Sequence, residues 1–235
     1  MMDIQKIAEM LDAAAKNAQA VPQFDLQGQL SLPDAYRVQA QAMHLRLERG
    51  AHRTGVKMGF TSRAKMIQMG IQDLIWGRLS SDMLIEEGSS IDFTRYVHPR
   101  VEPELAFVLK RPLSGNVNMV EALAAVEAIA PALEIIDSRY QDFKFTLPEV
   151  VADNASSSGY VIGPWSDPHG DFSNLGLTLN IDGRAVQVGS TAAILGHPLR
   201  SLVAAARLSA QACEPLRAGD VVMAGGATPA EWIRP

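Results

Sequence analysis

Cysteine, basic charge and long apolar runs are all scarce in this chain. Cys213 is the only cysteine, so an intrachain disulfide is impossible and a reducing compartment fits. The 21 Lys and Arg residues are outnumbered by 26 Asp and Glu residues, and the net charge of −5 provides no basic surface for nucleic acid. No apolar run approaches the length of a transmembrane helix, and no signal-peptide core follows the first residues. We therefore expect a cytoplasmic protein that binds neither nucleic acid nor a membrane.

Several common functional motifs are also missing. The sequence has no G-x-G-x-x-G loop, no Walker loop and no H-E-x-x-H motif. It shows no internal repeat, and strands do not alternate regularly with helices as they would in a doubly wound fold. Ser62-x-x-Lys65 matches one element of an acyl-transfer site, but the S-D-N and K-T-G elements that accompany it are absent. These absences argue against a nucleotide-binding or acyl-transfer enzyme.

The chain does contain a helical N-terminal part followed by a strand-rich remainder. Apolar residues recur at helical spacing over residues 3–19, and a second helix is predicted over residues 32–49, where a capping box precedes it and a glycine ends it. We expect a helical unit over residues 1–54 and a strand-rich catalytic domain over residues 55–235, which together make an α+β protein.

The remainder shows short apolar segments separated by turn residues. A hairpin is predicted for 175–181 and 184–188, because Asp182-Gly183 between them is typical of a type I′ turn. Gly225-Gly226 marks a place where backbone approaches another group closely. The predicted strands cover 56–60, 91–96, 105–109, 133–137, 160–163 and 221–224, and the predicted helices cover 63–69, 119–129 and 198–212.

Two glutamates stand at the head of one apolar strand, residues 105–109. Glu102 and Glu104 are two residues apart, a spacing that puts both carboxylates on one face of a strand. Burying two ionised carboxylates side by side costs roughly several kcal/mol each unless a positive charge compensates. Glu134, within the apolar segment 132–136, offers a third carboxylate. Three such groups suit Mg²⁺ or Mn²⁺ and leave coordination positions open for a substrate and water.

A second interpretation of the paired glutamates needs no metal. Glutamates at this spacing more often face solvent, and Pro103 between them cannot donate a ladder hydrogen bond, which fits the edge of a sheet. The third glutamate in an equally apolar setting favours the metal site without deciding between the two interpretations.

Several blocks of sequence, in order, resemble one known family. The resemblance is to the fumarylacetoacetate hydrolase superfamily, in its branch of 2-hydroxypentadienoate hydratases and 2-oxo-3-hexenedioate (4-oxalocrotonate) decarboxylases, and it covers nearly the whole chain. It implies the strand-rich β-roll or mixed sheet of the fumarylacetoacetase C-terminal domain. It rests on Val-Lys-Met-Gly-Phe-Thr-Ser at 56–62, His-Pro-Arg-Val-Glu-Pro-Glu at 98–104, Pro-Ala-Leu-Glu-Ile-Ile-Asp-Ser-Arg at 131–139, Val-Ala-Asp-Asn-Ala-Ser at 151–156 and Leu-Gly-His-Pro-Leu at 195–199.

The resemblance also implies a site. It implies that Glu102, Glu104 and Glu134 bind Mg²⁺ or Mn²⁺. It further implies that three residues from other segments line the substrate pocket as catalytic groups, namely Lys57, Asp82 and Ser156.

The substrate would be held by Lys57 and Ser156. Its distal carboxylate would be recognised by Arg139 or Lys144, two cations in the segment that follows Glu134. A buried strand lysine is rare, which favours a functional role for Lys57.

Within the branch, two stretches look more like the decarboxylases, residues 58–70 and 136–145, and Ser62 stands where hydratases typically carry His. The resemblance therefore implies metal-dependent decarboxylation of 2-oxo-3-hexenedioate to 2-hydroxypenta-2,4-dienoate in the meta-cleavage degradation of aromatic compounds. A 2-hydroxypenta-2,4-dienoate hydratase is the alternative, and a non-catalytic scaffold subunit of a hydratase complex is a third.

Assembly and the C-terminal end give two further expectations. Apolar surface helices predict a homo-oligomer, and a complex with a pathway hydratase is a further partnership to test. Family members usually continue past the Gly225-Gly226 region with another Gly-Asp turn and closing strands, whereas this sequence stops at Pro235. The resemblance therefore predicts that the C-terminal end of the domain is incomplete here.

Overall fold

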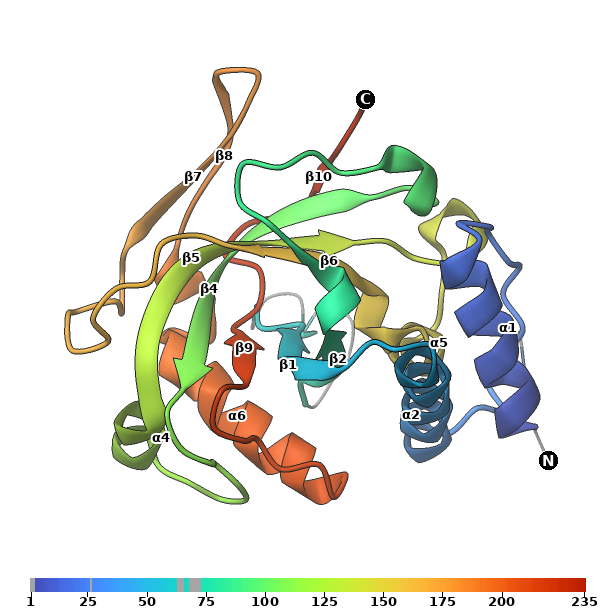
Figure 1. Ribbon diagram of the computed structural model, residues 1–235, viewed down its shortest axis with the longest axis horizontal. Helices are drawn as coiled ribbons and strands as arrows, with labels where there is room; N and C mark the ends of the chain where they lie inside the picture. Colours follow the sequence, from blue (N-terminus) through green and yellow to red (C-terminus); the bar gives the residue numbers. More distant parts are fainter. Residues whose placement is uncertain (1–2, 26, 63–65, 68–72) are drawn as a thin grey trace.

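One curled mixed sheet organises the chain in the computed structural model, which describes residues 3–25, 27–62, 66–67 and 73–235 (Figure 1). Within those residues the sheet has eight strands in the order β2-β1-β9-β4-β5-β6-β3, and β10 pairs with β4. The pairs β1–β9 and β3–β6 are parallel and the others antiparallel, so the predicted α+β class with a mixed sheet is confirmed. The strands are β1 (Arg53–Gly59), β2 (Ile75–Ser80), β3 (Leu84–Ile85), β4 (Arg100–Leu109), β5 (Val126–Ile136), β6 (Ser157–Ile162), β9 (Val221–Met223) and β10 (Glu231–Trp232).

A separate hairpin, β7 (Gly176–Ile181) and β8 (Arg184–Ser190), projects from this sheet (Figure 1). Its turn residues Asp182 and Gly183 have φ angles of 52° and 75°. Both angles lie in the left-handed region that a type I′ turn requires, so the predicted hairpin is confirmed.

The two longest strands, β4 and β5, run antiparallel through the middle of the sheet. Their register sets Glu102 opposite Glu134 and Pro103 opposite Leu133. The carbonyl of Pro103 accepts a hydrogen bond from the backbone N–H of Ala227 at 3.0 Å, on the side of β4 away from β5. The sheet-edge interpretation of Pro103 is therefore wrong, because chain lies on both sides of β4 at this point.

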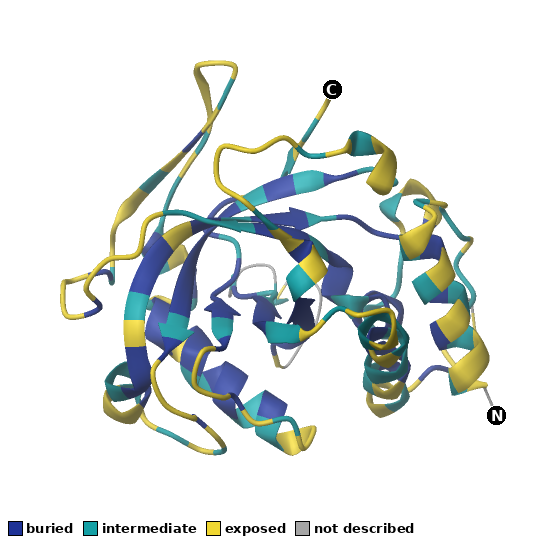
Figure 2. Cartoon of the chain, viewed as in Figure 1, coloured by how far each residue is buried: buried dark blue, intermediate teal, exposed yellow. Residues whose placement is uncertain are grey.

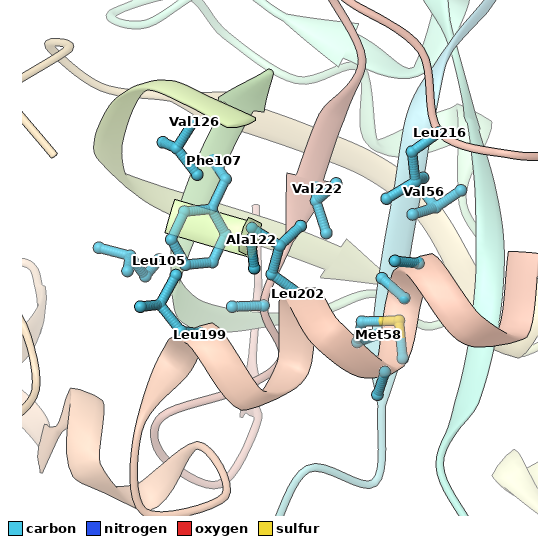
Figure 3. Packing of buried hydrophobic residues seen from close by; sticks show 14 of the residues in the cluster. Val56, Met58, Leu105, Phe107, Ala122, Val126, Leu199, Leu202, Leu216 and Val222 are labelled. Carbon is cyan, nitrogen blue, oxygen red and sulfur yellow. The ribbon is translucent and has the colours of Figure 1, made fainter. Parts of the chain in front are cut away.

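Helices cover the sheet at two places (Figure 1). Helix α6 (Pro198–Gln211) lies across β1, β9 and β4, where Leu199 and Leu202 pack in one cluster with Phe107 and Val222 (Figure 3). Figure 2 shows buried residues concentrated on the facing sides of α6 and these strands. The described residues include no helix that is both long enough and apolar enough to cross a bilayer. The remaining helices are α1 (Ile4–Lys16), α2 (Leu32–Glu48), α4 (Met119–Ala125) and α5 (Leu147–Ala152).

Two predicted elements are wrong and one lies largely outside the described residues. The helix predicted over 119–129 ends at Ala125, because the chain from Val126 pairs with β4 along its length and this pairing overrides the helical propensity of the alanines. The strand predicted over 91–96 is a 3₁₀ turn, Phe93–Arg95, in which Asp92 accepts a hydrogen bond from Thr94 N at 3.0 Å. Of the helix predicted over 63–69, only residues 66–67 are described.

The N-terminal helices share a hydrophobic cluster with the rest of the chain. Ala8 and Leu11 of α1 and Val38 of α2 pack with Tyr140 and with Val151 of α5. Helices α1 and α2 therefore bury their apolar faces against residues that follow them in the chain, including those of α5.

The carboxylate of Glu149 fastens this junction. Its Oε1 accepts the backbone N–H groups of Phe24 and Asp25 at 2.9 and 3.0 Å, and its Oε2 accepts from Gln23 at 2.9 Å and from the Thr146 backbone at 2.8 Å. Four donors from two segments converge on one fully buried side chain.

Replacing Glu149 by glutamine, which keeps the shape and removes the charge, should destabilise the protein. The amide group presents N–H donors to N–H donors, and leaving buried donors unsatisfied costs about 1–3 kcal/mol. Urea unfolding of Glu149→Gln measures the loss. Glu127→Gln, at an exposed position on β5, is the matched control and should change stability by less than about 0.5 kcal/mol.

The stability difference between wild type and Glu149→Gln should depend on pH. Burial, the largest single contribution, raises the pKa of Glu149, but hydrogen bonds from Thr146, Asp25 and Gln23 together bring it below its ordinary value. Because the unfolded chain is protonated first as pH falls, this stabilisation is complete above about pH 4.3 and is lost through the lower folded pKa. The difference between wild type and Glu149→Gln should shrink in that window, and a constant difference down to acid denaturation would contradict the assignment.

Candidate active site

Three glutamates from two strands converge at one point of the sheet. Glu102 and Glu104 lie on β4 and Glu134 lies on β5, directly opposite Glu102. One carboxylate oxygen from each lies within 4.8 Å of the others, and Glu104 and Glu134 are fully buried while Glu102 is partly exposed. A single cation could therefore contact all three side chains.

The protein compensates only some of the buried oxygens of this cluster. Glu104 Oε2 accepts a hydrogen bond from Gly225 N at 2.8 Å, but Glu104 Oε1 and Glu134 Oε1 have no hydrogen-bond partner among the described residues. Burial and then the charge of Glu134 raise the pKa of Glu104 well above its ordinary value. An all-oxygen, anionic and buried donor set of this kind fits a hard divalent cation such as Mg²⁺ or Mn²⁺.

Lys57 of β1 borders the same cluster. Its Nζ lies 3.1 Å from Glu134 Oε2 and donates a hydrogen bond to the Ala155 carbonyl at 3.0 Å. Burial is the largest influence and lowers the pKa of Lys57, but the charges of the three glutamates together raise it above its ordinary value. The lysine is therefore held as an ammonium ion that can attract a carboxylate or donate a proton.

Ser156 lies in the same cavity, of about 120 Å³, with Lys57 and Glu102. Its side chain is buried, and its Oγ has no hydrogen-bond partner within the described parts of the chain. A buried hydroxyl without a partner costs free energy unless a ligand or water satisfies it. The rings of Phe143 and Phe145 form part of the apolar wall of this cavity. The lining also includes Phe60, Thr61 and Gly226.

Two glycines allow the backbone to approach the glutamates. Gly225 has φ of 105°, and a Cβ there would lie 2.2 Å from Thr61 Oγ1. A Cβ on Gly226 would lie 2.7 Å from Glu102 Oε2. The predicted close approach of the backbone at Gly225-Gly226 is therefore confirmed, and it is made to the glutamate cluster.

The structure does not bring Asp82 and Arg139 to the glutamates. Both line a second cavity of about 210 Å³ beside α1 and α2. Asp82 forms an ion pair with Arg46 at 2.7 Å, and the buried Arg139 is paired with Asp153. A sequence shows that such residues are polar, but it does not show which cavity they line.

Lys144, the other predicted partner of the distal carboxylate, is an exposed residue. Its side chain is 72% exposed, and its Nζ lies 3.7 Å from Asp142 Oδ2. Lys144 does not line the cavity that contains Lys57, Glu102 and Ser156. Neither Arg139 nor Lys144 is therefore part of the cavity wall beside the glutamates.

One residue near the site was not singled out from the sequence. The guanidinium carbon of Arg100 lies 4.1 Å from the ring centre of Phe143 and 4.0 Å from that of Trp232. Arg100 precedes Glu102 by two residues on β4, so the alternation that groups Glu102 with Glu104 would also have placed Arg100 on their face. Its aromatic partners come from distant segments and carry no such signal.

A curled mixed sheet with a buried carboxylate cluster beside a lysine has the features of a metal-dependent enzyme. The family model for the fumarylacetoacetate (FAA) hydrolase C-terminal domain matches residues 56–235. The chain therefore belongs to the fumarylacetoacetate hydrolase family.

Individual proteins of this family are also similar to the chain over most of its length. The chain is 58% identical over 234 residues to a 4-oxalocrotonate decarboxylase from Pseudomonas sp., covering 100% of this chain and 91% of that protein. It is 34% identical to a 2-keto-4-pentenoate hydratase from Paraburkholderia xenovorans, covering 98% and 87% of the two chains. The solved structure of 4-oxalocrotonate decarboxylase from Pseudomonas putida G7, complexed with magnesium and adipate, matches with a TM-score of 0.95 and 36% identity, covering 99% of this chain and 90% of that one.

Gly226→Ala should weaken divalent cation binding, because the added methyl group forces Glu102 out of position. Disturbing the support of a metal ligand typically costs about 10- to 100-fold in affinity. Calorimetric titration with Mn²⁺ measures the change. Gly170→Ala, where a Cβ meets no atom within 4 Å, is the control and should bind Mn²⁺ like the wild type. Equal affinity in all three proteins would contradict this prediction.

Glu104→Gln should change stability in opposite directions with and without metal. In EDTA the folded state holds the Glu104 proton more tightly than the unfolded chain does, so ionisation at neutral pH is destabilising. The variant should gain roughly 0.5–2 kcal/mol there. In saturating Mg²⁺ the wild type should gain about 2.7 kcal/mol at 100 times Kd while the variant gains little. Thermal unfolding in both buffers tests this, and parallel shifts in both proteins would contradict it.

Proposed function

We propose that this chain is a carboxy-lyase that decarboxylates 2-oxo-3-hexenedioate (4-oxalocrotonate) to 2-hydroxypenta-2,4-dienoate with the help of Mg²⁺ or Mn²⁺. The observation that carries the proposal is the convergence of three carboxylates on a buried point beside Lys57. The 58% identity to a 4-oxalocrotonate decarboxylase across the whole chain supports the reaction, and the magnesium and adipate complex of a similar protein supports the cofactor and the substrate class.

The cofactor would be held by Glu102, Glu104 and Glu134. A divalent cation in that position supplies a Lewis acid that polarises the 2-oxo group of a bound substrate. The three side chains need no rearrangement to present oxygens to one ion, since they already lie within 4.8 Å of one another.

The chain's own groups would manage the charge that develops in the reaction. Breaking the bond to the distal carboxylate releases CO₂ and sends the electron pair through the conjugated chain to the 2-oxygen. The Lys57 ammonium and the Ser156 hydroxyl, which line the same cavity, would stabilise that oxygen, and Lys57 would donate the proton that completes the 2-hydroxy product. Phe143 and Phe145 help to exclude water, which strengthens these interactions.

A hydratase acting on 2-hydroxypenta-2,4-dienoate is the second candidate, because the chain is also 34% identical to a hydratase over 235 residues. That reaction needs a group that activates water. Among the described residues, the cavity lining holds no histidine, and its acidic lining residue is a member of the glutamate cluster.

Assembly and cellular setting complete the proposal. We infer a homo-oligomeric cytoplasmic enzyme in the meta-cleavage degradation of aromatic compounds, with a pathway hydratase as a further partner. Exposed apolar residues support self-association or partner binding, since Leu84 and Trp165, 50% and 44% exposed, border a broad groove beside Tyr160 and Ile162.

Measuring CO₂ release from 2-oxo-3-hexenedioate and water addition to 2-hydroxypenta-2,4-dienoate, both with Mg²⁺, separates the two functions. We expect decarboxylation to dominate. Lys57→Met should lower its kcat by about 10²- to 10⁴-fold, whereas Lys110→Met, at an exposed position after β4, should leave it unchanged. Efficient hydration together with an untouched dioic acid would overturn the proposal.

A further inference from the structure

The turn that carries Ser156 has an unusual backbone. Asn154, Ala155 and Ser156 have φ angles of 50°, 51° and 60°, so three successive residues other than glycine adopt the left-handed conformation. Each such residue costs roughly 1–2 kcal/mol, and left-handed residues normally occur singly. The surrounding structure must therefore hold this turn in place.

The side chain of Asn154 supplies such a hold. Its Oδ1 accepts a hydrogen bond from Arg78 N at 2.8 Å, and its Nδ2 donates to Arg78 O at 2.9 Å. Arg78 lies on β2, the first strand in the order of the sheet, so the amide group occupies backbone positions that a neighbouring strand would otherwise take. One side chain thus ties the turn to the sheet through two hydrogen bonds.

Gly77 lets the turn come this close. A Cβ on Gly77 would lie 2.6 Å from the Asn154 carbonyl oxygen and 3.2 Å from Lys57 Cδ. Gly77 is also the partner of Lys57 in the β1–β2 register. Gly77 therefore lies between the turn and the aliphatic part of the Lys57 side chain, close to both.

Two groups of the site depend on the position of this turn. The Ala155 carbonyl accepts the hydrogen bond from Lys57 Nζ at 3.0 Å, which directs the ammonium toward Glu134. Ser156 carries the buried Oγ in the cavity. A shift of the turn would move both while leaving the glutamates on β4 and β5 in place.

We propose that Asn154 is a positioning residue for the reaction. The two hydrogen bonds between its side chain and the Arg78 backbone, here called the clamp, hold the left-handed turn that orients Lys57 and Ser156 toward the substrate. The inference rests on the proposed function for its kinetic readout. Asn154 itself does not touch the glutamate cluster, so metal binding and positioning are separable by experiment.

The first test is Asn154→Gly, which removes both hydrogen bonds but keeps a residue that tolerates a left-handed backbone. We expect kcat with Mg²⁺ to fall about 10- to 100-fold, as for a displacement of about 1 Å in a catalytic group, while the Kd for Mn²⁺ stays within threefold of wild type. Gly77→Ala should have the same pattern because it pushes the turn away from the sheet. Gly176→Ala, where a Cβ meets nothing within 4 Å, should have no effect.

A merely structural role is separated by comparison with Glu149→Gln, which is expected to lose stability without losing kcat. Crystal structures of Asn154→Gly should show the Lys57 to Ala155 contact lengthened beyond hydrogen-bond distance. Wild-type kcat in Asn154→Gly, or a lower kcat accompanied by an equal loss of Mn²⁺ affinity, would overturn the positioning role. A wild-type protein that binds Mn²⁺ but does not release CO₂ would instead contradict the proposed function, and the crystallographic contact would still test the clamp.

Discussion

The site depends on the mutual repulsion of buried carboxylates at the centre of the sheet. Glu104 and Glu134 are fully buried within reach of Glu102, and Lys57 offsets only part of their negative charge. Such an arrangement is unfavourable for folding alone, because desolvation and repulsion both act against ionised carboxylates. It becomes favourable when a dication is bound, so the same residues that limit the stability of the protein without metal would provide its affinity for Mg²⁺ or Mn²⁺.

The rest of the fold serves to hold these charges at fixed positions. The register of β4 and β5 sets Glu102 opposite Glu134, and Gly225 and Gly226 allow a third segment to approach them. The turn that carries Ala155 and Ser156 lines the same cavity, and the Ala155 carbonyl accepts a hydrogen bond from Lys57. Side chains on paired strands are held more precisely than side chains on loops, which suits a site that must bind an ion and a substrate together.

Strand periodicity was sufficient to group Glu102 with Glu104, since alternation alone puts residues two apart on one face. It could not predict that Glu134 lies opposite Glu102, because that depends on which strands pair and in which register. The predicted end of helix α4 was wrong for a similar reason. Pairing with β4 decided the conformation of the residues that follow Ala125, although they have helical propensity. Asp82 and Arg139 were expected at the site, yet they line a second cavity. The sequence carries no signal for the contact of Asn154 with the Arg78 backbone, because the two residues are 76 positions apart.

The central claim is that three glutamates hold one divalent cation. Anomalous X-ray scattering from a crystal containing Mn²⁺ tests it most directly. The account predicts a single strong peak within about 2.5 Å of one oxygen each from Glu102, Glu104 and Glu134. A peak elsewhere, or one at this place without contact to Glu134, would contradict it.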